Sequence, residues 1–228
     1  MSHPPLLELR TVSYRYVAAK RPALHSVQLD LEAGEILGVA GPNEAGKTTL
    51  CMIASGFAPA SIGGWLQGEV RLDGALLPTS DAWQLAGRTG LLLADAASRR
   101  SGMTTTVFEE VALGPTNLGL AVASTVELVE WALDALGIGG LALRHPAHLS
   151  GGQAQLVAIA SILAMRPRLV VLDEPVAELD EEGRGRVVAA LRAIAAAGSS
   201  VIVTEHDLGF LASLGARMAT IRNGRLSA

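Results

Sequence analysis

The sequence predicts an α/β protein built on a mainly parallel β-sheet. Half of its 228 residues are apolar, largely Ala and Leu, while aromatic residues make up only 4%. This composition suits Ala-rich helices packed closely on a sheet. In the last third of the chain, apolar strand-like runs alternate with helix-like segments. Strands separated by helices imply crossover connections, which join parallel strands.

The N-terminal third is predicted to consist mainly of strands, because its apolar residues alternate or form short runs between turn signals. Turns are expected at Ala33-Gly34 and Asp73-Gly74. The short apolar run Glu35–Ala40 has the character of a buried strand. The other strands expected before the middle of the chain are Leu7–Val12, Val27–Leu31, Leu66–Leu72 and Thr89–Leu93.

The rest of the chain is expected to be helical at first and then to alternate between strands and helices. Residues from about 104 to 165 have helical character, since apolar residues between Ser124 and Leu136 recur every three or four positions. No low-complexity linker, repeat or charge block interrupts the sequence, so we expect a single domain over 1–228. The elements expected in the last third are Leu169–Leu172, Asp180–Ala197, Val201–Thr204, Asp207–Leu214 and Met218–Arg222.

Composition also narrows the possible partners. A net charge of −4 gives no overall attraction to nucleic acid or anionic lipid. No apolar run reaches the roughly 18 residues of a membrane span, so we expect membrane association only through a partner. The single cysteine, Cys51, excludes an internal disulfide and is expected to be a small core residue.

Ligands of open parallel sheets bind beyond the carboxyl ends of the strands. The segment that follows Ala40 fits the pattern G-x-x-x-x-G-K-[ST] and leads into a predicted helix, Thr48–Ser55. In that context backbone N–H groups form a nest for a phosphate, Lys47 can bridge the β- and γ-phosphates, and Thr48 can ligate magnesium. We therefore expect ATP and Mg²⁺ to bind at this segment, called the P-loop below. Its residues are Gly41, Pro42, Asn43, Glu44, Ala45, Gly46, Lys47, Thr48 and Thr49.

Two further strand ends carry side chains that suit a nucleotide site. The apolar strand from Leu169 ends in Asp173 and Glu174, whose side chains point in different directions and can take different roles. Asp173 can hold magnesium, and Glu174 can polarise the attacking water as a general base. His206 follows the next predicted strand, where it can contact the γ-phosphate. Another strand end, after Leu93, carries no comparable group.

A second helix start has features of an anion site. The sequence Leu149-Ser-Gly-Gly-Gln153 precedes a predicted helix, and its backbone N–H groups and hydroxyl suit an anion. Simple capping by Ser150 is the alternative. Because the P-loop already serves this chain's own nucleotide, we expect the second helix start to act on another molecule's nucleotide. The residues concerned are Ser150, Gly151, Gly152 and Gln153, called the signature segment below.

Together with the P-loop, Leu169–Pro175, Ala177–Asp180 and His206, this segment resembles the ATPase domain of ABC transporters over nearly the whole chain. The resemblance implies a P-loop NTPase fold of ABC type. Its mainly parallel core, about 1–93 and 166–228, would include an N-terminal antiparallel β subdomain, and about 94–165 would form a helical signature subdomain.

The same resemblance assigns further roles. It implies that Tyr16 stacks on the adenine and that Asp180 lies in a loop that communicates between two sites. It implies a head-to-tail dimer, in which each ATP lies between one chain's P-loop and the other chain's signature segment.

Two segments, Ser101–Leu120 and Leu7–Tyr16, are similar to energy-coupling factor (ECF) ATPases, which drive vitamin and transition-metal-ion importers. This implies a peripheral protein at the cytoplasmic face of the membrane. Its partners would be a second ABC ATPase subunit, identical or homologous, and integral membrane transport subunits, with no nucleic acid. Such ATPases often carry a further C-terminal region, whose function we expect to be absent from a chain that ends at Ala228.

Two residues depart from the family pattern. Glu44 stands where the family usually has Gly, and we expect its side chain to face solvent or a partner rather than phosphate. Ala94 stands where the family has a Gln that helps to ligate magnesium and to position water, and Ala offers no donor or acceptor. Gln84 is a poor substitute, whereas Asp95 could take the position by a one-residue shift.

Three hypotheses follow. The first is an active ATPase subunit of an importer, favoured by Lys47, Asp173, Glu174 and His206. The second, favoured by Ala94, is a mainly ATP-binding or regulatory half of a heterodimer with slow turnover at its own site. The third is an ABC-type protein of DNA repair or translation, against which stands the lack of coiled-coil insertions and basic linkers.

Overall fold

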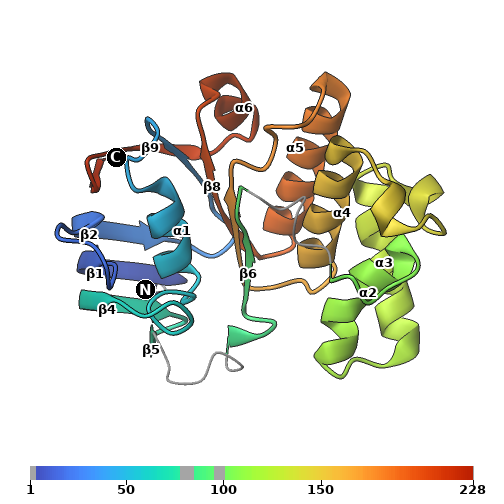
Figure 1. The fold of residues 1–228 in the computed structure, drawn as a ribbon, viewed down its shortest axis with the longest axis horizontal. Helices are drawn as coiled ribbons and strands as arrows, with labels where there is room; N and C mark the ends of the chain where they lie inside the picture. Colours follow the sequence, from blue (N-terminus) through green and yellow to red (C-terminus); the bar gives the residue numbers. More distant parts are fainter. Residues whose placement is uncertain (1–3, 78–84, 95–100, 228) are drawn as a thin grey trace.

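The computed structural model describes residues 4–77, 85–94 and 101–227. A four-stranded antiparallel sheet lies at one end of the molecule, a six-stranded sheet lies in the middle, and a group of helices lies at the other end (Figure 1). The four-stranded sheet has the order β2-β1-β4-β5. Its strands are β1 (Leu7–Arg15), β2 (Leu24–Leu31), β4 (Trp65–Leu72) and β5 (Ala75–Leu77).

The six-stranded sheet has the order β10-β9-β3-β8-β7-β6. Its five strands from β9 to β6 are parallel, and β10 pairs antiparallel with β9. The predicted α/β class with a mainly parallel sheet is therefore confirmed. The strands are β3 (Ile36–Ala40), β6 (Thr89–Leu92), β7 (Leu169–Asp173), β8 (Ser200–Glu205), β9 (Arg217–Arg222) and β10 (Arg225–Ser227).

Six α-helices connect and cover these strands in the described part of the chain. They are α1 (Lys47–Ala54), α2 (Val107–Asn117), α3 (Val122–Ala135), α4 (Gly151–Leu163), α5 (Glu181–Ala196) and α6 (Leu208–Ser213). Short 3₁₀ turns lie at Gly139–Leu141 and Pro146–His148. None of the described helices combines the length and the apolarity that crossing a bilayer requires.

Most elements lie within a residue or two of their predicted bounds, but β1 and β2 extend three residues further than expected. The reason is that each strand carries an irregularity, since their pairing shifts register between Leu9 and Val12 and again between Val12 and Tyr14. Thr11 and Ser26 adopt left-handed conformations, with φ of 50° and 48°. A bulge of this kind interrupts the two-residue alternation that marks a strand in the sequence. The short strands β5 and β10 were not predicted.

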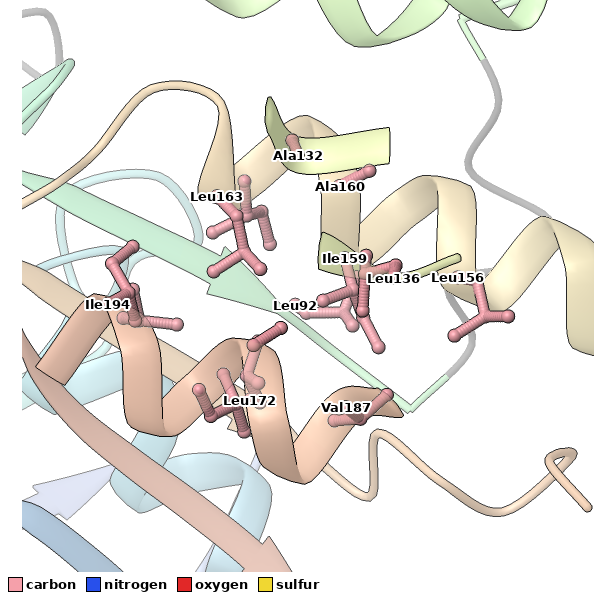
Figure 2. Close-up of a cluster of buried hydrophobic side chains, with 14 of the residues drawn as sticks. Leu92, Ala132, Leu136, Leu156, Ile159, Ala160, Leu163, Leu172, Val187 and Ile194 are labelled. Carbon is pink, nitrogen blue, oxygen red and sulfur yellow. The ribbon is translucent and has the colours of Figure 1, made fainter. Parts of the chain in front are cut away.

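Two apolar cores hold the site in place. In the first, α4 packs on β6, α5 packs on β8, and α3 packs against both of these helices (Figure 2). Its labelled side chains include Ile159 and Leu163 of α4, Leu172 of β7 and Ile194 of α5, which are 0–1% exposed. Burying each such side chain contributes about 1.5–3 kcal/mol. This core therefore fixes α4, with the signature segment at its start, against the central sheet.

The second core lies around α1, between the two sheets (Figure 1). Leu50, Cys51 and Ile53 of α1 are 0–1% exposed and pack in the same cluster as Val171 of β7 and Ile202 of β8. The helix that follows the P-loop is thus held against the two strands whose ends carry the predicted catalytic groups.

Candidate functional site

The P-loop connects β3 to α1 and passes close to β9. Gly46 has φ of 108°, a conformation that residues with a side chain rarely adopt. A Cβ atom on Gly41 would collide with the carbonyl oxygen of Ile221 in β9. Both glycines are therefore required by the path of the chain. The P-loop hollow, about 280 Å³, is lined by Ala23, Asn43, Glu44, Gly46, Lys47, Thr48, Thr49 and Glu174.

Lys47 lies at the centre of this site. Its side chain is 5% exposed, and its Nζ donates to the carbonyl oxygens of Gly41 (3.0 Å) and Pro42 (3.2 Å). The same Nζ lies 3.2 Å from Oε1 of Glu174 and 3.0 Å from Nε2 of His206. An ammonium held within the curve of the P-loop is well placed to donate to phosphate oxygens.

Glu174 and His206 are neighbours, with His206 Nε2 2.9 Å from Glu174 Oε1. Glu174 has φ of 51°, a left-handed conformation that costs a non-glycine residue about 1–2 kcal/mol. Its backbone N–H nevertheless donates to Thr204 of β8 (2.9 Å). This turn aims the Glu174 carboxylate at the P-loop. The structure thus gives the physical reason for the divergent directions predicted for the two adjacent carboxylates.

Asp173 points to the other side, under the start of α1. The Thr48 hydroxyl donates to its Oδ2 (2.6 Å), and the Thr204 hydroxyl donates to its Oδ1. Asp173 is 1% exposed, so these two donors offset the cost of burying its carboxylate. The pair Thr48 and Asp173 presents hard oxygen donors, which fit Mg²⁺.

Glu205 is a site residue that the sequence analysis missed. This carboxylate is 6% exposed and accepts the backbone N–H groups of His206 (3.0 Å) and Val176 (3.3 Å). Burial raises its pKa from the ordinary value of a glutamate. Glu205 thereby ties the end of β8, which carries His206, to the segment after β7. Its position next to His206, at the end of an apolar strand, is the sequence signal that could have identified it.

The sequence also singled out Tyr16, Glu44 and Ala94. The Tyr16 hydroxyl hydrogen-bonds to Thr49 Oγ1 (2.9 Å), and the Tyr16 ring packs edge-on against Tyr14, with centroids 5.0 Å apart. Glu44 is exposed and has φ of 61°, and it also lines the P-loop hollow. Ala94 is exposed just beyond β6. The two residues considered as its substitutes, Gln84 and Asp95, lie outside the described residues.

The signature segment lies in a different hollow. Ser150 caps α4: its Oγ accepts from Gln153 N (3.3 Å), while Gln153 Oε1 accepts from Ser150 N (3.2 Å). Asp180 likewise caps α5 by accepting from Gly183 N (2.8 Å). The signature hollow, about 680 Å³, is lined by Ser150, Gly152, Gln153, Glu178, Asp180 and neighbours, and shares no lining residue with the P-loop hollow.

A phosphate-binding loop between a strand and a helix, with carboxylates and a histidine at the adjacent strand ends, defines a P-loop nucleoside triphosphatase. The family model for the ABC transporter matches residues 24–177 of the chain. The chain therefore belongs to the ABC transporter family of ATP-binding proteins, whose members are transport-coupled ATPases.

Named relatives refine this result. A cobalt import ATP-binding protein CbiO of Rhodobacter capsulatus is 39% identical, over 98% of this chain and 78% of the relative. An energy-coupling factor transporter ATP-binding protein EcfA of Methanothermobacter thermautotrophicus is 35% identical, over 98% and 70%. A putative ABC transporter ATP-binding protein of Pyrococcus abyssi is 35% identical, over 97% and 79%.

Solved structures confirm the fold. The CbiO1 protein of Clostridium perfringens, part of the ABC transporter complex CbiONQ, has a TM-score of 0.84 at 25% identity. That match covers 99% of this chain and 88% of the other. A dimeric ATP-binding cassette bound to ADP and Pi also has a TM-score of 0.84, at 24% identity, over 97% of both chains.

Proposed function

We propose that the chain hydrolyses ATP to power a membrane importer of the ECF type, for vitamin or transition-metal-ion uptake. The observation that carries this proposal is the convergence of Lys47, Glu174 and His206 at the P-loop, within 3.2 Å of one another. Two relatives named for energy coupling and for cobalt import favour that class of transport.

Each residue at the P-loop has a chemical role in this proposal. The backbone of the loop cradles the β-phosphate, and Lys47 donates to the β- and γ-phosphates. Glu174 polarises the attacking water as general base, and His206 contacts the γ-phosphate. Thr48 and Asp173 would hold Mg²⁺, which neutralises charge on the phosphates when bound. Tyr16, beside Thr49, would stack on the adenine.

The signature segment completes a site on another chain. Its separation from the P-loop hollow supports this, because the hollow lined by Ser150, Gly152 and Gln153 shares no lining residue with the P-loop hollow. The chain would therefore work as a head-to-tail dimer with a second ABC ATPase subunit, identical or homologous. Docked on integral transport subunits, it would lie at the cytoplasmic face of the membrane as a peripheral protein.

A complementation experiment tests the head-to-tail arrangement. Lys47→Ala inactivates the P-loop side, and Ser150→Arg blocks the signature side. In a random mixture of the two variants, half of the dimers carry one intact composite site, so about a quarter of the wild-type ATPase activity per chain should return. Each variant alone should remain inactive. No recovery on mixing would contradict the arrangement.

An alternative is that this chain is mainly the ATP-binding or regulatory half of a heterodimer. Ala94 favours it, because losing a water-positioning group can lower turnover while ATP binding is largely kept. The test is ATP turnover of the assembled transporter with Glu174→Gln in this chain, compared with the same change in the partner ATPase. Near-equal losses would exclude the asymmetric arrangement.

A further inference from the structure

The start of α4 is covered by a side chain from the same protein. If Gly151 carried a Cβ atom, that atom would overlap Oε2 of Glu178 and lie 3.3 Å from its Cδ. The backbone carbonyl oxygen of Glu178 lies 3.0 Å from the corresponding position on Gly152. The carboxylate of Glu178 therefore occupies the space left open by the missing side chain of the first residue of α4.

The Glu178 carboxylate lies where the potential of a helix favours a negative charge. The first turn of a helix has exposed N–H groups and positive potential, so it stabilises a carboxylate or a phosphate placed there. Among the residues that the structure describes, no cationic side chain forms an ion pair with Glu178. In the same hollow, Arg186 is paired with Glu182, and Asp180 adds a further negative charge as the cap of α5.

We propose that Glu178 is an internal anion that competes with the γ-phosphate of the second chain's ATP for the start of α4. This inference rests on the proposed head-to-tail function. Glu178 is an exposed side chain, so it can swing away when a nucleotide arrives. Until it does, its charge repels the incoming triphosphate. Glu178 thereby sets how readily ATP brings two chains together, without contacting the nucleotide bound at its own P-loop.

The test is the ATP-dependent association of two chains, measured by sedimentation equilibrium with Mg-ATP in a Glu174→Gln background that slows hydrolysis. Glu178→Gln removes the charge and keeps the size of the side chain. For each composite site, it should lower the dissociation constant of the dimer about twofold to fivefold at low salt, the range expected for one charge at a helix start. The gain should shrink as salt is raised, because screening weakens the repulsion.

A matched control is Glu181→Gln. It removes the same charge from the first turn of α5, at a residue that does not line the signature hollow, and it should leave association unchanged. Equal association with and without the Glu178 charge, no association in either case, or a gain that is independent of salt would each overturn the proposal.

Failure of the proposed function is recognised separately, from ATP binding by the single chain. If Lys47→Ala binds ATP as tightly as the parent protein, the proposed function is wrong. If ATP binding requires Lys47 and the parent chains associate with Mg-ATP, but Glu178→Gln does not tighten that association, only the role of Glu178 is wrong. If neither protein associates, the head-to-tail pairing of two copies is wrong as well.

Discussion

The reactivity of the single cysteine reports directly on ATP binding. Cys51 lies in α1, the helix that begins at Lys47, and its side chain is 0% exposed. Burial raises the pKa of its thiol well above the ordinary value, and the nearby Asp173 carboxylate raises it further. Because the thiolate is the reactive form, native Cys51 should react with an aromatic disulfide reagent at pH 8 only when α1 detaches or the protein unfolds.

The size of the ATP effect follows from linkage. Detaching α1 destroys the P-loop, so ATP binds only the closed form. At an ATP concentration of about 100 times the dissociation constant, binding stabilises that form by about 2.7 kcal/mol. Labelling of Cys51, followed by absorbance after mixing with reagent, should then slow by about 100-fold.

Two results would refute this reasoning. Labelling at the rate of an unfolded thiol would show that α1 is not packed as described. Labelling that is slow but insensitive to ATP would show that ATP binding does not stabilise the packed position of α1. The control is Lys47→Ala, in which protection at the same ATP concentration should fall from about 100-fold to about twofold to tenfold, while slow labelling without ATP persists.

Three further tests of packing and strain use denaturant unfolding. Leu163→Ala, at a side chain 0% exposed, should lower the free energy of unfolding by about 2–5 kcal/mol, whereas Leu143→Ala, at one 87% exposed, should change it by less than about 0.5 kcal/mol. Glu44→Gly should be about 1 kcal/mol more stable than Glu44→Ala, because only glycine relieves the left-handed conformation. Thr204→Val should cost about 1–3 kcal/mol, because buried Asp173 loses one of its two hydroxyl donors. Equal losses of stability in Leu163→Ala and Leu143→Ala, or equal stabilities of Glu44→Gly and Glu44→Ala, would contradict the structure described. So would an unchanged free energy of unfolding in Thr204→Val.

Much of the fold could be predicted from the sequence because most elements follow a simple period. Helix α5 and strand β7 show this, since each lies within a residue of its expected bounds. The ends of β1 and β2 could not be predicted, because the irregularities at Thr11 and at Ser26 depend on how the two strands pair. The order of the strands in the sheet likewise depends on packing between distant segments.

The residues of the candidate site likewise divide into those that the sequence predicts and those that it does not. Residues in a motif of fixed spacing, such as Lys47 and Thr48, could be predicted because strand, loop and helix are adjacent in sequence. The supporting residues could not, because they depend on the strand order β3-β8-β7. That order places Thr204 directly beside Asp173 and Glu205 beside Ala40, which explains why the two polar side chains at the carboxyl end of β8 are buried at the site.

Equilibrium ATP binding to the single chain tests the central claim most directly. Removing the buried ammonium with Lys47→Ala deletes its charge-assisted hydrogen bonds, so ATP affinity should fall by about 10-fold to 150-fold. Glu174→Gln, which alters the proposed general base, should bind ATP as tightly as the wild type. Unchanged affinity in Lys47→Ala would contradict the assignment of this loop as the nucleotide site.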